Sequence, residues 1–334
     1  MESPRARRGR RARPSRTRPL LSTALAVVAV VGVTAAGTVY VKAQAHSGPA
    51  PVSSRTSASS SATADGRESV EPVAEPTVDH DALLSEAMES VAVEDGAAVS
   101  VAVLDLDSGE SAAYGDDAFD TASIVKVDIL AALLLRAQDE DRHLTAAEKS
   151  YATRMIENSD NASASALWDA IGQADGLDAA NKTFGLTGTE GGEGALWGLT
   201  QTTAADQLTL LRQVFGEDSK LTAASRSYLQ GLMGRIEADQ HWGVSAAADG
   251  TRWALKNGWL ARSTTGLWDI NSIGRVRAGG RTFLVAVLSD GNSTQAKGIS
   301  LVEAVAKAAV SVFTGDGDGS SASASPSASA TASS

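Results

Sequence analysis

The chain has 334 residues, a formal net charge of −11 and 43% hydrophobic residues, enough for one substantial core. It contains no cysteine, which excludes disulfides, thiolate metal sites and a cysteine nucleophile. Its four histidines are scattered and neither H-E-x-x-H nor G-x-S-x-G occurs, so a zinc hydrolase or a Ser-His-Asp esterase has little support, and we expect no metal and no cofactor.

The N-terminal region concentrates positive charge. Residues 1–19 contain eight arginines and Glu2, a local charge of +7 that leaves −18 for the rest of the chain. This basic segment directly precedes 22 residues without a charge, 20–41, which is typical of membrane targeting and, by the positive-inside rule, keeps residues 1–19 in the cytoplasm. The length suits a transmembrane anchor, whereas Ala43-Gln44-Ala45 suits signal peptidase. We therefore expect export, either membrane-anchored or secreted after cleavage near Ala45.

Low-complexity segments flank the predicted folded domain. Residues 42–77, rich in Ser, Ala, Pro and Thr, predict a flexible linker, and residues 315–334 predict a disordered Ser/Ala tail. The remaining part, 78–314, is acidic, which argues against nucleic acid as a partner.

Hydrophobic periodicity predicts an α+β order of elements within 78–314. The named helices are expected at 79–91, 203–215, 222–233 and 299–313, together with helices around the motifs described below. The expected strands are 99–104, a second strand through Tyr114, 251–260, 267–277 and 281–288. Two strands, a helical insert, three strands and a closing helix indicate an α+β fold.

The most unusual residue of the domain is Lys126. It lies in the apolar run 124–135, in which Asp128 is the only other charge, and three residues after Ser123. Positions i and i+3 share one face of a helix, so hydroxyl and amine can meet. Apolar surroundings lower the pKa of an amine, which then accepts a proton near neutral pH. A core lysine extending to solvent is the alternative, since roughly one S-x-x-K is expected by chance in such a chain.

Two further polar motifs follow Ser123 in the sequence. Ser159-Asp160-Asn161 lies between a helix opened by a predicted capping box, 145–148, and an Ala-rich helix. Lys256-Asn257-Gly258 lies in the expected strand 251–260.

Each tripeptide alone is an ordinary loop or strand end. In the order S-x-x-K, S-D-N and K-x-G they resemble the motifs of class A β-lactamases and penicillin-binding serine hydrolases. The resemblance covers about residues 78–314. It implies a mostly antiparallel sheet flanked by helices, with a helical subdomain and an active site in the cleft between them.

The resemblance also implies roles for individual residues. Ser123 would attack a carbonyl carbon, with Lys126 as general base. The developing oxyanion would receive hydrogen bonds from the backbone N–H of Ser123, in the first helical turn, and from that of Trp259. Ser159 would relay a proton to the leaving nitrogen, and Asn161 would bind an amide of the substrate.

The strand motif would bind the carboxylate of the substrate, mainly through the charge of Lys256 and beside Gly258. Asn257 departs from the Thr or Ser that the family has at this position, although an amide can still donate to a carboxylate. Asp160 is expected to fix its loop through local bonds to the backbone.

A larger departure concerns hydrolysis of the acyl-enzyme. Class A β-lactamases carry a glutamate in an E-x-x-x-N loop between the second and third motifs. Here the residues four positions after Glu190 and Glu193 are Gly194 and Trp197, and a solvated Gly-rich loop is the favoured interpretation. The sequence therefore predicts an acyl-enzyme on Ser123 that hydrolyses slowly.

Three functions remain open at this point. The first is an exported serine hydrolase that attacks β-lactam amide bonds. The alternatives are a D-Ala-D-Ala carboxypeptidase-like cell-wall hydrolase and a penicillin-binding module with little turnover. In each case the partner is a small β-lactam or a cell-wall peptide, the membrane is contacted only through an uncleaved N-terminal segment, and the protein is expected to be a monomer.

Overall fold

The structure is a computed structural model that describes residues 78–315. The predicted segments 1–19, 20–41 and 42–77 lie outside these residues, as does the predicted tail apart from Gly315. Within residues 78–315, no helix is long and apolar enough to cross a membrane. The anchor, the linker and the tail therefore stay predictions.

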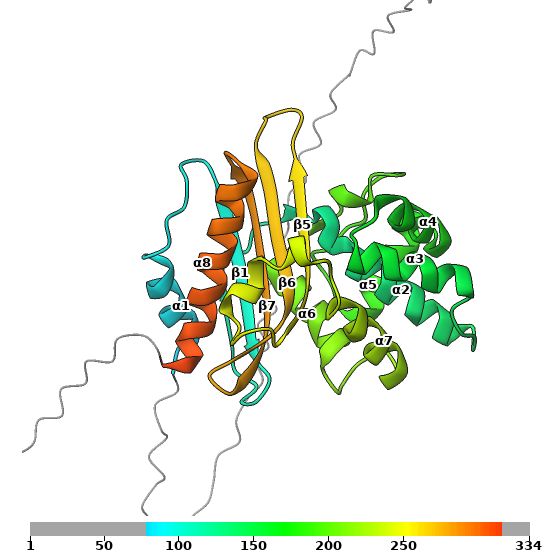
Figure 1. Ribbon diagram of the computed structural model, residues 1–334, viewed down its shortest axis with the longest axis horizontal. Helices are drawn as coiled ribbons and strands as arrows, with labels where there is room; N and C mark the ends of the chain where they lie inside the picture. The colour runs from blue at the N-terminus through cyan, green and yellow to red at the C-terminus, as the bar shows by residue number, and fades with distance from the viewer. Residues whose placement is uncertain (1–77, 316–334) are drawn as a thin grey trace, which may run out of the picture. The chain divides into compact units, whose positions relative to one another are not determined.

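A five-stranded antiparallel sheet forms the centre of the domain (Figure 1). Its strands are β1 (Ala98–Asp105), β2 (Ser111–Tyr114), β5 (Trp253–Ala261), β6 (Trp268–Ala278) and β7 (Arg281–Asn292). They are ordered β2-β1-β7-β6-β5, so the N-terminal strand β1 pairs with the C-terminal strand β7, with Val101 opposite Val287. This order leaves β5 at one edge of the sheet.

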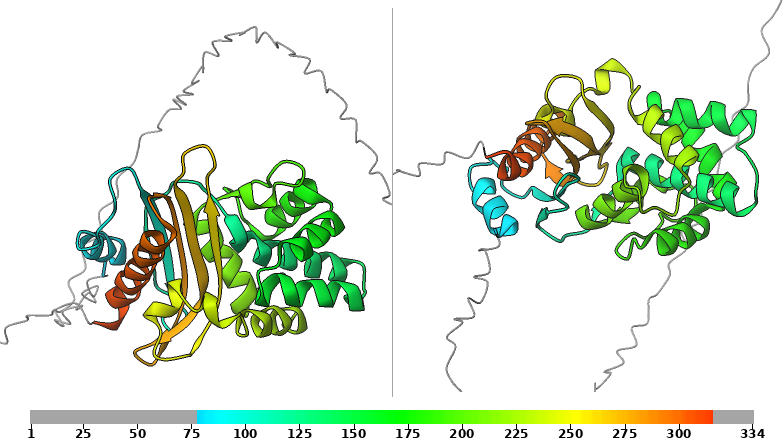
Figure 2. Two further views of the ribbon diagram at one scale, coloured as in Figure 1. Left: turned by 45° about the horizontal axis from the view of Figure 1, so that its top comes forward. Right: turned by 90° about the horizontal axis from the view of Figure 1, so that it is seen from below.

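Helices cover both faces of the sheet (Figures 1 and 2). One face packs against α1 (His80–Met88) and α8 (Gln295–Thr314), and the other faces the helical part of the chain. Successive residues of β1 accordingly belong to two cores: Val101 and Val103 to the α1/α8 side, and Ala102 and Leu104 to the helical side. Burial of both faces explains why this strand is apolar almost throughout.

The helical part is built around α2 (Val125–Asp139), which is buried almost throughout, and the ends of several of its helices are set by capping residues. Its other helices are α3 (Ala146–Glu157), α4 (Asn161–Ile171), α5 (Gln173–Phe184), α6 (Ala204–Phe215) and α7 (Ala223–Met233). The predicted capping box is present in α3, where Thr145 accepts from the Glu148 N–H and Glu148 accepts in return. Thr203 and Thr222 cap α6 and α7. Their side chains accept hydrogen bonds from the backbone N–H groups three residues later, those of Asp206 and Ser225.

The predicted fold class is confirmed: the fold is α+β, with an antiparallel sheet flanked by helices. Several element limits differ from the prediction, and the two largest differences are of four residues each. The last helix begins at Gln295 instead of 299, because Thr294 caps it by accepting from the Lys297 N–H. The last strand continues to Asn292 instead of 288, since its polar end still pairs with β1 and β6. The pair β3 (Phe119–Asp120) and β4 (Gln201–Thr202) was not predicted.

Candidate active site

Ser123 lies in a short 3-10 turn, Ala122–Ile124, that leads directly into α2. The residue before it, Ala122, has a left-handed backbone with φ +48°, a conformation that costs a non-glycine residue about 1–2 kcal/mol. A side chain of β6 holds this segment. Asn271 Nδ2 donates to the carbonyls of Asp120 and Thr121 at 2.9 and 3.1 Å. This support keeps a strained turn in place at the candidate nucleophile.

Lys126 points back along α2 to Ser123 and is fully buried. Its Nζ lies 2.9 Å from Ser123 Oγ, 2.7 Å from the Ser159 carbonyl, 3.0 Å from Ser159 Oγ and 2.8 Å from Asn161 Oδ1. Burial lowers the pKa of Lys126 from 10.5 to about 7, against the opposing effect of the Asp160 charge. The amine is therefore available in neutral form near neutral pH.

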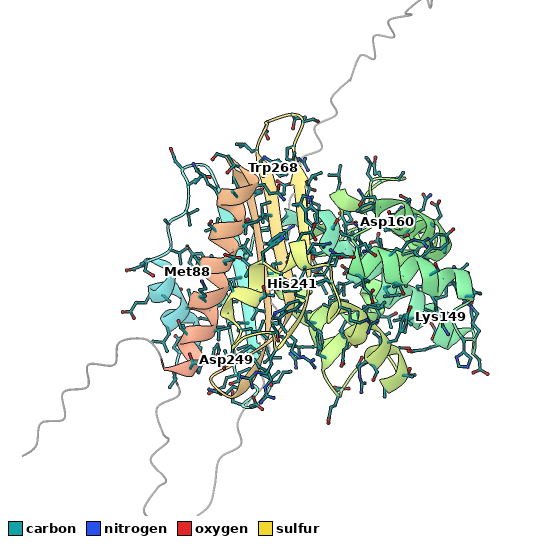
Figure 3. All side chains as sticks on the ribbon, in the orientation of Figure 1. Met88, Lys149, Asp160, His241, Asp249 and Trp268 are labelled. Carbon is teal, nitrogen blue, oxygen red and sulfur yellow. The ribbon has the colours of Figure 1, made fainter. Side chains whose placement is uncertain are left out.

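The S-D-N motif turns sharply at the start of α4. Ser159 has φ +56°, and this backbone directs both its carbonyl and its hydroxyl to Lys126. Asp160 caps α4 by accepting from the Ser163 N–H at 2.8 Å, the local role expected for it. Asn161 is the first residue of the helix. In Figure 3, Asp160 marks this start of α4, and His241 marks the segment before β5, in front of the sheet.

Lys256 reaches the same hydroxyl from β5. Its Nζ lies 3.1 Å from Ser159 Oγ, 2.8 Å from the Asn257 carbonyl and 3.5 Å from Gln240 Oε1, and the side chain is fully buried. Burial, and then the nearby charge of Lys126, holds the pKa of Lys256 well below its ordinary value. Neither lysine forms a salt bridge within residues 78–315. An anionic group entering the site would favour the charged forms of both.

Gly258 brings β5 against the turn that carries Ser123. A Cβ at this position would lie 2.7 Å from the Thr121 carbonyl oxygen, 2.9 Å from Ser123 N and 3.0 Å from Ile124 N. Only glycine permits this approach. The backbone of Trp259, the second expected oxyanion donor, follows on the same edge strand.

Asn257 requires a correction. Its Nδ2 donates to the carbonyls of Gln240 and Trp242 at 2.8 and 3.1 Å, and its Oδ1 accepts from Ser272 Oγ at 2.6 Å. The side chain is fully buried and both amide hydrogens are used. The prediction that Asn257 donates to the carboxylate of a substrate does not fit this placement, because the amide instead ties the segment before β5 to the sheet.

The Gly-rich loop after α5 reaches the site with an indole. Glu190 and Glu193 are exposed, and neither carboxylate has a hydrogen bond or ion pair with another residue of the range 78–315. Trp197, by contrast, places its ring centroid 5.0 Å from Lys126 Nζ and donates from Nε1 to Ser165 Oγ at 3.1 Å. The sequence showed Trp197 only as the residue replacing the asparagine of E-x-x-x-N.

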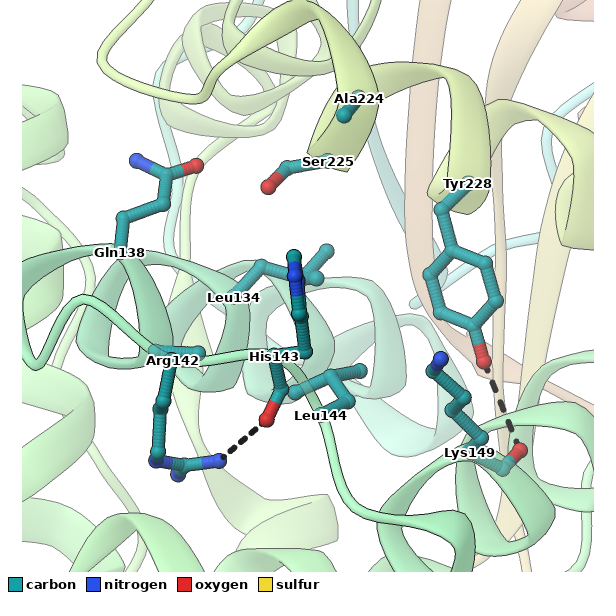
Figure 4. A pocket seen from close by; sticks show the side chains of 10 residues that line it. Leu134, Gln138, Arg142, His143, Leu144, Lys149, Ala224, Ser225 and Tyr228 are labelled. Atoms are coloured by element: carbon teal, nitrogen blue, oxygen red, sulfur yellow. Dashed lines mark hydrogen bonds between the residues drawn. The ribbon is translucent and has the colours of Figure 1, made fainter.

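A separate hollow of about 200 Å³ lies between the end of α2, the start of α3 and α7 (Figure 4). Ten residues line it: Leu134, Ala137, Gln138, Arg142, His143, Leu144, Lys149, Ala224, Ser225 and Tyr228. None of them belongs to the three motifs. Within 78–315, no group of three or more His, Asp or Glu side chains is arranged to hold a metal ion.

Comparisons with known proteins identify the family and the fold of the chain. A model of the β-lactamase enzyme family matches residues 83–149 and 147–313. No curated protein matches the chain.

Solved structures share the fold at low sequence identity. PBP-A is 21% identical, with a TM-score of 0.60 over 70% of this chain and 96% of its own. A class A β-lactamase from Bacteroides cellulosilyticus is 16% identical, with a TM-score of 0.61 over 72% and 100% of the two chains. The TLA-1 extended-spectrum β-lactamase is 14% identical, with a TM-score of 0.61 over 70% and 98%.

Proposed function

The chain belongs to the β-lactamase enzyme family, and from this membership we propose that it is a serine hydrolase that opens β-lactam amide bonds through an acyl-enzyme on Ser123. One observation carries the proposal. Four side chains form a continuous path, from Ser123 Oγ to Lys126 Nζ at 2.9 Å, on to Ser159 Oγ at 3.0 Å and to Lys256 Nζ at 3.1 Å. A path of this kind can remove a proton from a nucleophile and deliver one to a leaving group.

Acylation involves three proton transfers. Neutral Lys126 accepts the Ser123 hydroxyl proton while Oγ bonds to the carbonyl carbon. As the carbon–nitrogen bond breaks, the nitrogen takes a proton from Ser159, which is replenished from the Lys126 ammonium. The products are an ester on Ser123 and an amine. The pKa of about 7 for Lys126 supports the first step, because the free base is then abundant at neutral pH.

The negative charge that develops on the carbonyl oxygen requires donors nearby. The close approach of Gly258 to Ser123 N supports a pair of donors formed by the backbone N–H groups of Ser123 and Trp259. Two buried lysines that form no salt bridge with a carboxylate of residues 78–315 favour a substrate that carries an anionic group, such as the carboxylate of a β-lactam. Lys256 contacts Ser159 and Asn161 contacts Lys126, and these two side chains are the proposed binding groups.

Hydrolysis of the ester is proposed to be slow. The two carboxylates of the Gly-rich loop, Glu190 and Glu193, are exposed, and no hydrogen bond or ion pair to another residue of the range 78–315 fixes either of them as a base. The same observation favours the alternative function, a D-Ala-D-Ala carboxypeptidase-like cell-wall hydrolase for which a β-lactam is a poorly released inhibitor. A related crystal structure is described as a PBP-A mutant in an acyl-enzyme complex with penicillin G, at 22% identity. A penicillin-binding module with little turnover is the third possibility.

We also propose that the protein is exported. The arginine-rich residues 1–19 and the uncharged residues 20–41 support an extracytoplasmic domain, either anchored or released. N-terminal sequencing of the mature protein distinguishes the two forms. A chain that begins at His46 was cleaved, whereas a chain that keeps residues 20–41 and fractionates with membranes is anchored.

Labelling with a fluorescent penicillin tests the proposed chemistry. The wild type should carry the label covalently, and Ser123→Ala should carry none, because the variant lacks the hydroxyl beside Lys126. Ser300→Ala removes an exposed hydroxyl on α8 and should label like the wild type. Labelling of Ser123→Ala at the wild-type rate would exclude Ser123 as nucleophile. Turnover of a chromogenic cephalosporin, measured beside D-Ala release from a D-Ala-D-Ala peptide, separates the first two functions.

A further inference from the structure

The indole of Trp197 lies beside the Lys126 amine, together with the oxygen atoms that surround it. Ser123, Ser159 and Asn161 provide four oxygens within 3.0 Å of Nζ, and the Trp197 ring centroid lies 5.0 Å away. The exposed fraction of Lys126 is 0%. The amine therefore has no solvent-exposed surface, and the indole is one of the groups that surround it.

Contacts at both ends of the loop fix the indole in this position. Trp197 Nε1 donates to Ser165 Oγ on α4 at 3.1 Å, and Trp168 Nε1 donates to the Gly194 carbonyl at 2.7 Å. Next to Trp197, a Cβ on Gly198 would lie 3.9 Å from Ala122 Cα, so the loop backbone reaches the turn that carries the nucleophile. The ring is therefore a built part of the site.

The charged groups that face Lys126 are few. Asp160 approaches from α4 and Lys256 from β5, and the carboxylates of the loop itself, Glu190 and Glu193, point to solvent. Within residues 78–315, Lys126 is also the only side chain that hydrogen-bonds to Ser123 Oγ. Lys126 is therefore the base that we assign to a water molecule attacking an ester on Ser123.

We propose, on the basis of the proposed acylation of Ser123, that Trp197 is a positioning residue that keeps water from Lys126 and thereby lengthens the life of the acyl-enzyme. The reaction that it slows is ordinary ester hydrolysis. The water oxygen bonds to the ester carbon, its proton passes to neutral Lys126, the bond from the carbon to Ser123 Oγ breaks, and Oγ recovers the proton from the Lys126 ammonium. Water enters the reaction and a carboxylic acid leaves, so no other reactant is required.

The lifetime of the penicilloyl-enzyme tests this role. Purified variants are labelled with penicillin G, excess reagent is removed, and the decay of the adduct is followed by intact-mass analysis. Trp197→Ala should shorten the lifetime at least about tenfold, because water reaches the general base. Trp197→Phe keeps an aromatic face and should stay within about threefold of the wild type. Trp197→Gln leaves a smaller space and should shorten the lifetime as Trp197→Ala does. It takes the place of the alanine variant if that variant does not fold.

A pH profile provides a readout that simple loosening of the loop would not change. Admitting water to Lys126 relieves its desolvation, so the acylation rate of Trp197→Ala should reach half of its plateau at a higher pH than that of the wild type. Ser165→Ala removes one of the contacts that hold the indole but keeps the ring, so its lifetime and its profile should lie between those of the wild type and of Trp197→Ala.

The outcomes separate this inference from the function on which it rests. Equal lifetimes in Trp197→Ala and the wild type, with normal labelling, would overturn the shielding role alone. A lifetime in Ser165→Ala as short as that in Trp197→Ala would also overturn it, because the anchoring of the loop would then be the cause. A wild type that takes no label would overturn the acylation of Ser123 itself.

Discussion

The two sides of Ser123 are built in opposite ways. On the side of α2, α4 and β5, Lys126, Ser159 and Lys256 are joined by hydrogen bonds of 3.1 Å or less, and both lysines are fully buried. On the side of the Gly-rich loop, the carboxylate of Glu193 is exposed and an indole takes the position next to the lysine. The difference teaches that formation and breakdown of an acyl-enzyme depend on separate parts of this chain and can be changed separately.

Among changes on the side of α2, α4 and β5, loss of the general base should have the largest effect on the rate of acylation. Lys126→Ala is expected to slow acylation by about a hundred to ten thousand fold, the range observed when a positioned base is removed. The rate of labelling by a fluorescent penicillin measures this. A loss below about tenfold would give Lys126 a structural role only. Lys149→Ala changes an exposed lysine on α3 and should leave the labelling rate unchanged.

Disruption of the close contact at Gly258 should have the next largest effect on the rate of acylation. Gly258→Ala places a methyl group 2.7 Å from the Thr121 carbonyl and 2.9 Å from Ser123 N, both backbone atoms that cannot turn aside. We expect acylation about 10- to 100-fold slower, because one oxyanion donor is displaced. The labelling rate is again the measurement. Gly231→Ala is the matched control, since its nearest neighbour is the movable end of Arg235 at 3.2 Å.

The pH dependence of acylation should show the desolvated amine directly. Only the neutral amine accepts the Ser123 proton, so the rate should rise about tenfold per pH unit below the pKa of Lys126 and level off above it. With a pKa of about 7, the profile should bend near neutrality. A rate that keeps rising to pH 10 would mean that the amine keeps its ordinary pKa.

A smaller effect concerns the free energy of unfolding and comes from a second charged residue of α2. Asp128 is buried in α2, Gln207 approaches one of its oxygens at 3.5 Å, and burial raises its pKa from 3.8 to about 7. The folded state then binds more protons than the unfolded state between about pH 4 and 7, so this group makes the free energy of unfolding fall as pH rises, by up to about 1.4 kcal/mol per unit.

Asp128→Asn removes this titration, so its advantage over the wild type should grow from pH 4 to 7 in urea unfolding. Asp139→Asn, an exposed change on the same helix, should show no such trend. A constant difference across the range for Asp128→Asn would contradict the raised pKa.

Local patterns in the sequence predicted much of this arrangement, and contacts between distant segments could not be predicted. The capping box of Thr145 and Glu148 predicted the start of α3, because both residues lie within one helical turn. The spacing of Ser123 and Lys126 predicted their contact for the same reason. Asn257 is different, since its partners Gln240 and Trp242 lie on another segment and Ser272 on the neighbouring strand. No pattern within β5 indicates that its amide is already occupied.

Mixing the wild type with a chromogenic cephalosporin tests the separation of the two sides most directly. The product should appear in a burst near one equivalent per enzyme and then slowly, with a persistent adduct on Ser123 in intact-mass analysis. Glu190→Gln and Glu193→Gln should leave the slow phase almost unchanged, since both carboxylates are exposed. Fast turnover by the wild type without a burst, together with loss of that turnover in either variant, would contradict this account. The Gly-rich loop would then be the source of the hydrolytic base.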